Sequence, residues 1–228
     1  MEKRKMNILI INGSAKADKG TTQLIINHIE NNLKDDTVNI FYPAQNIINE
    51  CIDCKKCFTN IGNCIFEDDM EQYLKEWDKS DLIILASPIY SYSMSSHLKK
   101  VLDRIRPLQT GKYKMNANGE FSPITRNKKK FSFLLISTCG FPEINNFKVI
   151  ETWFDSFIDQ YENYYSAGKI FLPASQIIFS SSFIEKFKKQ IEKNMANIKT
   201  LNYFEIKKEW IDKNEFSKIL TKYNAFVE

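Results

Sequence analysis

The sequence predicts an α/β fold built on a doubly wound, parallel β-sheet. Short apolar runs alternate with amphipathic helical patterns along the whole chain, as expected for consecutive βαβ units. The first run, Asn7 to Asn12, is apolar at every position between its ends and stops at Gly13-Ser14. A continuous apolar run of this length is typical of a strand buried on both faces of a parallel sheet.

Four further strand-like runs follow, separated by helical patterns. We expect strands at residues 37–42, 81–87, 131–138 and 164–172. We expect helices at residues 21–33, 68–77, 94–104, about 145–160 and 183–199, with a weaker pattern at 213–223. Asp68 and Asp69 begin the second helix, where negative charge is favourable. Five strands suit a flavodoxin-like sheet of order 2-1-3-4-5 with helices on both faces.

Two segments interrupt the alternation. Residues 51–67 carry four of the five cysteines, and residues 107–130 contain Asn118-Gly119, a strong hairpin-turn signal. The flanking apolar residues of this expected β excursion are Tyr113, Met115, Phe121 and Ile124. Neither segment reads as a linker. We therefore expect one domain over residues 1–228, with a core of about 6–200 and a C-terminal helical extension of about 201–228.

Composition and charge exclude several classes of protein. Hydrophobic residues make up 43% and charged residues 26%, which argues against disorder. The net charge of +4 is mild, and we expect no nucleic-acid partner. Apolar runs are far shorter than the roughly 20 residues of a membrane span, and the charged first residues lead directly into a strand without a signal-peptide core. We expect a cytoplasmic chain without membrane contact. Only two histidines occur, which argues against a mechanism with several imidazoles.

The loop after the first strand has the composition of a phosphate-binding loop. It runs from Gly13 to Thr22, is bounded by glycines, is rich in hydroxyls and leads into a helix N-terminus. It is neither a Walker loop nor a dinucleotide fingerprint, since no Gly-Lys-Thr closes it and G-x-G-x-x-G is absent. An ordinary strand-to-helix turn is the alternative. The expected cofactor-binding residues here are Ser14, Lys16, Gly20, Thr21, Thr22 and Gln23.

Two further loops have features that suit a planar ring. In each, a small or rigid residue is followed by an aromatic side chain close to exposed backbone N–H groups, although a plain turn is the alternative for either loop. Together with the first loop they describe a site for a phosphate at one end and a planar heterocycle at the other, a shape that FMN fits. The expected cofactor-binding residues are Pro88, Ile89, Tyr90 and Ser91 in one loop, and Thr138, Cys139 and Gly140 in the other.

The order of these pieces resembles a known family. The pieces are Gly13-Ser14, Gly20-Thr21-Thr22, Asp68-Asp69-Met70, Ser87-Pro88-Ile89-Tyr90, Lys99, Asp103-Arg104 and Thr138-Cys139-Gly140. Over roughly residues 6 to 175 they resemble the flavodoxin-like NAD(P)H-dependent FMN reductases. The resemblance implies that the first loop holds the FMN phosphate, that the other two flank the isoalloxazine, and that the chain forms a homodimer or higher homo-oligomer. The chain departs from the family pattern at Ala15, Thr21 and Tyr92, where Pro, Asn and a small residue are usual.

The flavin chemistry asks little of protein side chains. FMN accepts a hydride and passes on one or two electrons, while the protein positions the ring and tunes its potential. No catalytic side chain is assigned from the sequence. Tyr90 and backbone N–H groups beside the flavin are better candidates than any acid–base pair. Cys139 is either a small buried residue or a redox group near the ring.

The cysteine segment has the pattern Cys51-x2-Cys54-x2-Cys57-x6-Cys64. Such spacing can turn several thiolates toward one point, as an iron–sulfur cluster requires. It looks like the compact motif of the iron–sulfur flavoproteins, and that resemblance implies a [4Fe–4S] cluster on these four cysteines. Zinc, free thiols and reversibly oxidised thiols are the alternatives.

The leading hypothesis is an FMN-dependent oxidoreductase that takes electrons from NADH or NADPH to a small acceptor such as a quinone, a nitro compound or a flavin. The second is an iron–sulfur flavoprotein electron carrier with a ferredoxin-like partner. The third is a flavodoxin-shaped interaction module that binds no FMN. A low-molecular-weight tyrosine phosphatase is excluded, because no cysteine is followed six residues later by arginine.

Overall fold

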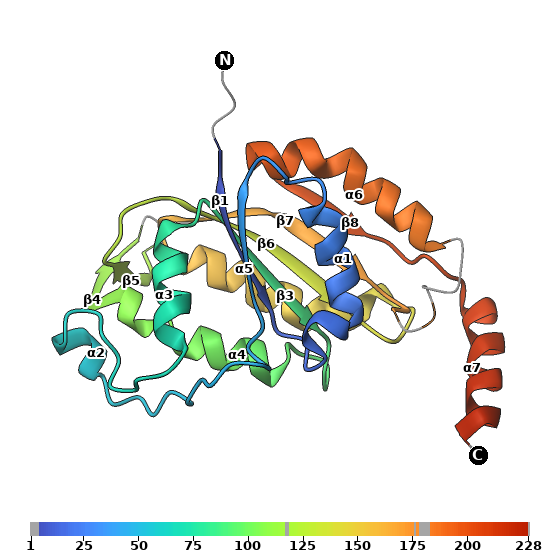
Figure 1. Cartoon of the computed structure of the whole chain (residues 1–228), viewed down its shortest axis with the longest axis horizontal. Helices are drawn as coiled ribbons and strands as arrows, with labels where there is room; N and C mark the ends of the chain where they lie inside the picture. Colours follow the sequence, from blue (N-terminus) through green and yellow to red (C-terminus); the bar gives the residue numbers. More distant parts are fainter. Residues whose placement is uncertain (1–4, 117–118, 176, 178–182, 228) are drawn as a thin grey trace.

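The computed structural model describes residues 5–116, 119–175, 177 and 183–227. Six strands form a fully parallel sheet in the order β2-β1-β3-β6-β7-β8 (Figure 1). Their bounds are β1 (Asn7–Asn12), β2 (Thr37–Phe41), β3 (Leu82–Pro88), β6 (Phe131–Thr138), β7 (Tyr164–Leu172) and β8 (Phe204–Lys207). The predicted strands therefore all form.

The predicted number of five strands is wrong. Beyond the five expected strands, β8 pairs in parallel with β7 and becomes an edge of the sheet. It lies within residues 201–228, which were expected to be a helical extension, and only α7 (Lys213–Val227) is helical there. Phe204 and Ile206 are buried on one face of β8, while Glu205 and Lys207 are exposed. Burial of these two apolar side chains draws the segment onto the sheet.

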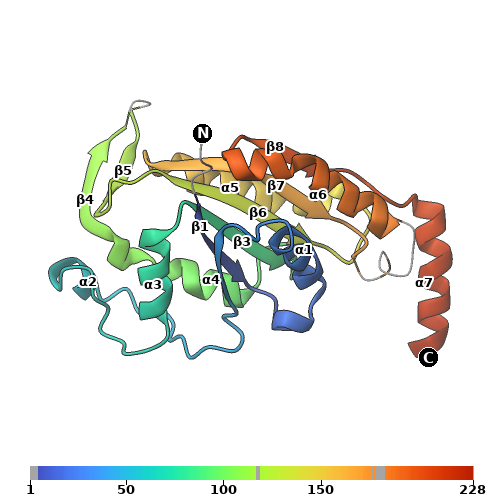
Figure 2. The same ribbon diagram turned by 45° about the horizontal axis from the view of Figure 1, so that its top comes forward.

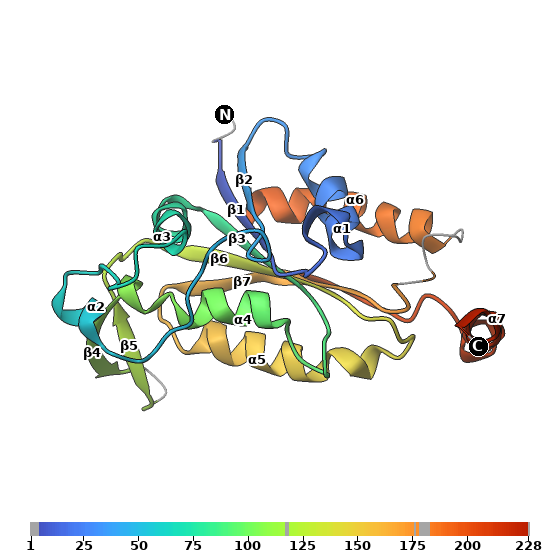
Figure 3. The ribbon, with the colours of Figure 1, turned by 60° about the horizontal axis from the view of Figure 1, so that its bottom comes forward.

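Helices cover both faces of the sheet, as the sequence predicts (Figure 3). One core contains side chains from α1 (Thr21–Glu30) and α6 (Phe183–Thr200) against the sheet. The other contains side chains from α3 (Met70–Lys79), α4 (Ser96–Asp103) and α5 (Lys148–Asp159). None of the helices within the described part of the chain has the length and apolar character needed to span a membrane.

The predicted β excursion is confirmed. β4 (Gln109–Met115) and β5 (Phe121–Thr125) form a separate antiparallel hairpin that projects beyond the sheet, close to the short helix α2 (Lys56–Thr59) (Figure 2). Gly119 has φ +80°, as the turn requires, and Asn118 lies outside the described residues. The described residues also include three short 3₁₀ turns: η1 (Ala17–Lys19), η2 (Arg106–Leu108) and η3 (Ile144–Phe147).

Candidate active site and cysteine pocket

The loops after β1, β3 and β6 lie side by side at the carboxyl edge of the sheet. The hydroxyl oxygens of Thr22 and Thr138 are 3.2 Å apart, which joins the start of α1 to the loop after β6. The Ile89 amide donates to the Thr138 carbonyl at 2.7 Å, which joins the loops after β3 and β6. Ligands of doubly wound sheets bind at this edge. The structure therefore brings together residues from all three loops that the sequence indicated.

The first loop presents a helix N-terminus with little room for side chains. Gly20 caps α1, and a Cβ added to Gly20 would lie 2.5 Å from Ser14 Oγ. Ser14 is buried, and its hydroxyl accepts a hydrogen bond from the Lys16 amide at 3.2 Å. The α1 backbone amides that begin at Thr21 form the positive end of the helix dipole. This arrangement suits an anion such as the FMN phosphate.

Two of the predicted cofactor-binding side chains are buried and contact other protein side chains instead. Gln23 is 4% exposed; its Oε1 accepts a hydrogen bond from Asn12 Nδ2 at 2.8 Å, and its Nε2 donates to Asn27 at 2.7 Å. Thr22 is buried against Thr138. Lys16, by contrast, is exposed. Assignment of any of these residues to FMN stays a prediction.

The second loop forms a tight turn that displays aromatic side chains. Tyr90 and Ser93 pair as an antiparallel bridge around Ser91 and Tyr92, whose φ angles are +47° and +64°. Tyr90 and Tyr92 are exposed, while Pro88 and Ile89 are half-buried. Two exposed aromatic rings beside a rigid turn can flank a flat heterocycle.

The third loop holds Cys139 as a neutral, buried thiol. The Cys139 amide donates to the Leu172 carbonyl at 3.0 Å, and its carbonyl accepts from the Ser175 amide at 2.8 Å. Burial raises the pKa of the Cys139 thiol, so it stays protonated near neutral pH. Gly140 is half-buried, and Phe141 is exposed. The buried setting favours the structural interpretation of Cys139 over a thiolate role.

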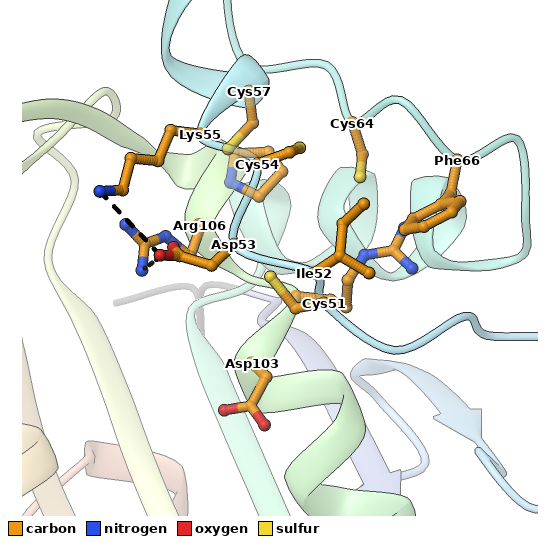
Figure 4. A pocket seen from close by; sticks show the side chains of 12 residues that line it. Cys51, Ile52, Asp53, Cys54, Lys55, Cys57, Cys64, Phe66, Asp103 and Arg106 are labelled. Carbon is orange, nitrogen blue, oxygen red and sulfur yellow. Dashed lines mark ion pairs between the residues drawn. The ribbon is translucent and has the colours of Figure 1, made fainter.

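All four clustered cysteines line one pocket with about 360 Å³ of empty space, part of which is open solvent (Figure 4). We call it the cysteine pocket; it is lined by Cys51, Ile52, Asp53, Cys54, Lys55, Cys57, Cys64, Phe66, Asp103, Arg104, Arg106 and Pro107. Burial raises the pKa of the Cys57 thiol, Arg106 opposes the rise, and Cys64 and Cys54 add to it.

The thiols do not form a closed site for a single ion. Across the described ranges, no group of three or more His, Cys, Asp or Glu side chains is arranged to hold a metal ion. A [4Fe–4S] cluster is much larger than one ion and takes one thiolate at each iron. The donor set fits such a cluster, because four cysteines from two limbs of one loop line a common pocket.

A buried ion pair holds Arg104, one of the residues that line the cysteine pocket, in place. Arg104 and Asp68 have side chains that are each 1% exposed, and two of their nitrogen–oxygen pairs lie at 2.9 and 3.0 Å. Arg104 also donates to the Asn49 carbonyl at 2.7 Å. Burial would lower the pKa of Arg104, but Asp68 and Cys64 raise it above its usual value.

Arg104 and Arg106 had no predicted role at the cysteine site, and Asp53 was expected only to add negative charge there. Arg106 extends to Asp53 at 3.2 Å (Figure 4). Its guanidinium carbon also lies 5.0 Å from the centre of the Phe58 ring. The Asp68–Arg104 pair joins residues that are 36 positions apart. The only sequence signal was the Asp103-Arg104 pair, which entered as part of a family resemblance and not as a cysteine-site residue.

Comparison with known proteins identifies related chains. The family model described as NADPH-dependent FMN reductase matches residues 6–121, about half of the chain. An iron–sulfur flavoprotein of Methanocaldococcus jannaschii is 34% identical over 108 residues, which is 46% of this chain and 55% of that one. An iron–sulfur flavoprotein of Clostridioides difficile is 31% identical over 103 residues, 43% of this chain and 45% of that one. The matched segments thus span about half the length of these relatives.

Solved structures share the fold at low sequence identity. An FMN-dependent NADH-azoreductase of Bacillus anthracis, in complex with FMN, has a TM-score of 0.60 at 14% identity and covers 84% of this chain and 98% of that one. An NAD(P)H:quinone oxidoreductase of Methanothermobacter marburgensis has a TM-score of 0.61 at 11% identity and covers 86% of this chain and 96% of that one.

Proposed function

The chain belongs to the NADPH-dependent FMN reductase family, and we propose that it passes electrons from NAD(P)H through FMN to a small acceptor such as a quinone, a nitro compound or a flavin. The observation that carries the proposal is the meeting of the three loops at the carboxyl edge of the sheet, joined through Thr138 to Thr22 and Ile89. The acceptor classes draw further support from solved neighbours that are described as an azoreductase and a quinone oxidoreductase.

The role of this chain's residues would be to position the cofactor, and no acid–base pair is assigned among them. FMN, when bound, supplies hydride acceptance and one- or two-electron release. The α1 N-terminus at Gly20 and Thr21 holds the phosphate, and Lys16 adds a positive charge. The Tyr90 loop and the Cys139–Gly140 loop flank the ring. We keep the catalytic side chains unassigned.

FMN binding is tested with Gly20→Ala. The added methyl group would lie 2.5 Å from Ser14 Oγ, so the Ser14 side chain or the loop backbone has to shift. We expect FMN affinity to fall about tenfold, equivalent to about 1.4 kcal/mol, in a titration followed by flavin fluorescence. The matched control is Gly119→Ala in the hairpin, where the added Cβ meets no atom within 4 Å. Equal FMN affinity in the wild type and Gly20→Ala would contradict the proposal that this loop binds the FMN phosphate.

Turnover is then tested with NADH and NADPH against a panel of quinones, nitro compounds, azo dyes and free FMN. We expect oxidation of at least one nicotinamide to depend on both FMN and an acceptor. A chain that binds no FMN would overturn the oxidoreductase proposal and favour the interaction module.

The second candidate function is an iron–sulfur flavoprotein electron carrier. The specific observation in its favour is that all four clustered cysteines line one pocket. Cys51, Cys54, Cys57 and Cys64 would hold the [4Fe–4S] cluster, which would relay single electrons to a ferredoxin-like protein partner. Protein purified without oxygen, then assayed for iron and acid-labile sulfide, should contain about four of each per chain. Zinc without sulfide, or four alkylatable thiols, would overturn this candidate and leave the reductase proposal in place.

We also propose that the chain acts in the cytoplasm as a homodimer or higher homo-oligomer, with no nucleic-acid or membrane partner. The dimer follows from the family resemblance. Sedimentation velocity with and without FMN is the direct check of the assembly state.

A further inference from the structure

Two arginines of the cysteine pocket carry buried N–H groups without a partner. The Nε atoms of Arg104 and Arg106 are both buried and make no hydrogen bond within the described part of the chain. Both side chains line the same pocket as the four cysteines. A buried, unsatisfied donor costs about 1–3 kcal/mol, so two of them in one pocket call for an acceptor.

Arg104 is rigidly positioned. Nη1 donates to the Asn49 carbonyl and to Asp68, and Nη2 donates to the other Asp68 oxygen. The Phe66 ring lies 5.0 Å from the guanidinium carbon. The carboxylate and the ring fix the guanidinium plane, while the buried Nε is without a partner in the pocket that Cys64 also lines.

Arg106, the first residue of η2, lies two positions after Arg104, which caps the C-terminus of α4. Its Nη1 pairs with Asp53 at 3.2 Å, and the Phe58 ring lies 5.0 Å from the guanidinium carbon. Asp53 also attracts Lys55, at 4.0 Å, but Lys55 is 67% exposed (Figure 4). The two cations on Asp53 thus differ in burial, which provides a matched comparison.

We propose that the Nε–H groups of Arg104 and Arg106 donate hydrogen bonds to the sulfur atoms held in the cysteine pocket and so raise the reduction potential of the cluster. Hydrogen bonds to cluster sulfurs and nearby positive charge favour the reduced, more negative state. The inference rests on the cluster function proposed above. It assigns a positioning and tuning role, not a catalytic one.

The test measures the cluster potential by dye-mediated titration with EPR and visible spectra, on protein that contains both cofactors. In Arg106→Lys, we expect the equilibrium constant for cluster reduction to fall about tenfold, or about 59 mV for one electron, and in Arg106→Gln, which also loses the charge, we expect a larger fall. The lysine variant keeps the charge but lacks Nε–H, so it separates the hydrogen bond from the charge. Arg104→Lys serves as a second measurement at the other donor.

The control is Lys55→Gln, which removes an exposed cation from the same aspartate. Because solvent screens an exposed charge, we expect the equilibrium constant for cluster reduction to change less than about threefold. Iron content and FMN absorbance verify that each variant is loaded. This inference alone would be overturned if the wild type and all Arg106 and Arg104 variants contain the full cluster and FMN and have the same cluster reduction potential. A wild-type chain that binds no iron would overturn the cluster proposal and, with it, this inference.

Discussion

Backbone strain at the residue scale is concentrated in the candidate sites. Eight described non-glycine residues have positive φ, and six of them lie in the first two cofactor loops or the cysteine segment. These six are Ala17, Asp53, Lys55, Ile61, Ser91 and Tyr92. Left-handed backbone costs such residues of order 1–3 kcal/mol each, and it persists where function or surrounding structure demands it. The two sites therefore carry conformational costs that the rest of the fold must offset.

Asp68 provides a residue-scale test through pH. Burial would raise the pKa of Asp68, but hydrogen bonds from Arg104 and Asn49 hold it below its usual value. The stability from this pair is therefore complete above the unfolded pKa of about 3.9 and is lost as pH falls through the lower native pKa. We expect Asp68→Asn to lower the free energy of unfolding by about 3 kcal/mol at pH 7, because it leaves Arg104 buried without a counter-charge.

The acid dependence distinguishes this pair from a general loss of packing. Urea denaturation from pH 6 down to pH 2.5 measures the difference in unfolding free energy between wild type and Asp68→Asn. We expect this difference to become smaller as the Asp68 carboxylate is protonated. A difference that stays constant over this range would mean that Asp68 acts without its charge.

At the scale of elements, the joint between β7 and β8 depends on one glycine. Gly168 has φ +140° and is aligned with Phe204, and a Cβ added to Gly168 would lie 2.2 Å from the Phe204 carbonyl oxygen. The β6–β7 register also shifts beside this residue, between Phe133 and Leu134. Close approach of the β8 backbone thus requires a residue without a side chain.

Gly168→Ala should detach β8 from the sheet. Combining overpacking with the unfavourable φ, we expect a loss of about 3 kcal/mol in unfolding free energy. Hydrogen exchange should show faster exchange of the β8 amides before the other strands are affected. Gly119→Ala, which has positive φ but no close neighbour, separates backbone strain from the steric clash. Unchanged β8 protection in Gly168→Ala would contradict this account.

The elements also show where sequence patterns suffice. Long apolar strands and amphipathic helices were predictable because each pattern extends over several residues, and the hairpin was predictable from its Asn-Gly turn. β8 was missed because it has only four residues, in which the apolar Phe204 and Ile206 alternate with Glu205 and Lys207, and so short a pattern does not predict a strand. Its pairing comes from contact with β7, which no local pattern encodes.

At the scale of the whole molecule, the sheet domain extends past residue 200. Trp210 and Ile211 are buried, and α7 then extends away from the sheet (Figures 1 and 2). The loops of the active site were predictable because their positions after parallel strands place them at one edge. The Arg104–Asp68 pair was not, because its partners are 36 positions apart and meet only in the tertiary structure.

Two truncations test this boundary. Removal of residues 213–228 should leave the unfolding free energy and FMN affinity near wild-type values. Removal of residues 201–228 also removes Phe204, Ile206 and Trp210, and should cost about 5 kcal/mol or more, at about 1.5–3 kcal/mol for each buried large side chain. Thermal unfolding monitored by circular dichroism compares the two. An equal loss of unfolding free energy in the two truncations would mean that α7 contributes the stability assigned here to residues 201–212.

The brevity of β8 also bears on how copies of the chain can meet. An open strand edge is a template for pairing with another chain, and proteins blunt it with short, charged strands. β8 is four residues long and displays Glu205 and Lys207 between its buried positions. Sheet-to-sheet polymerisation through the β8 edge is therefore disfavoured, and we expect association between copies to use surfaces other than this edge.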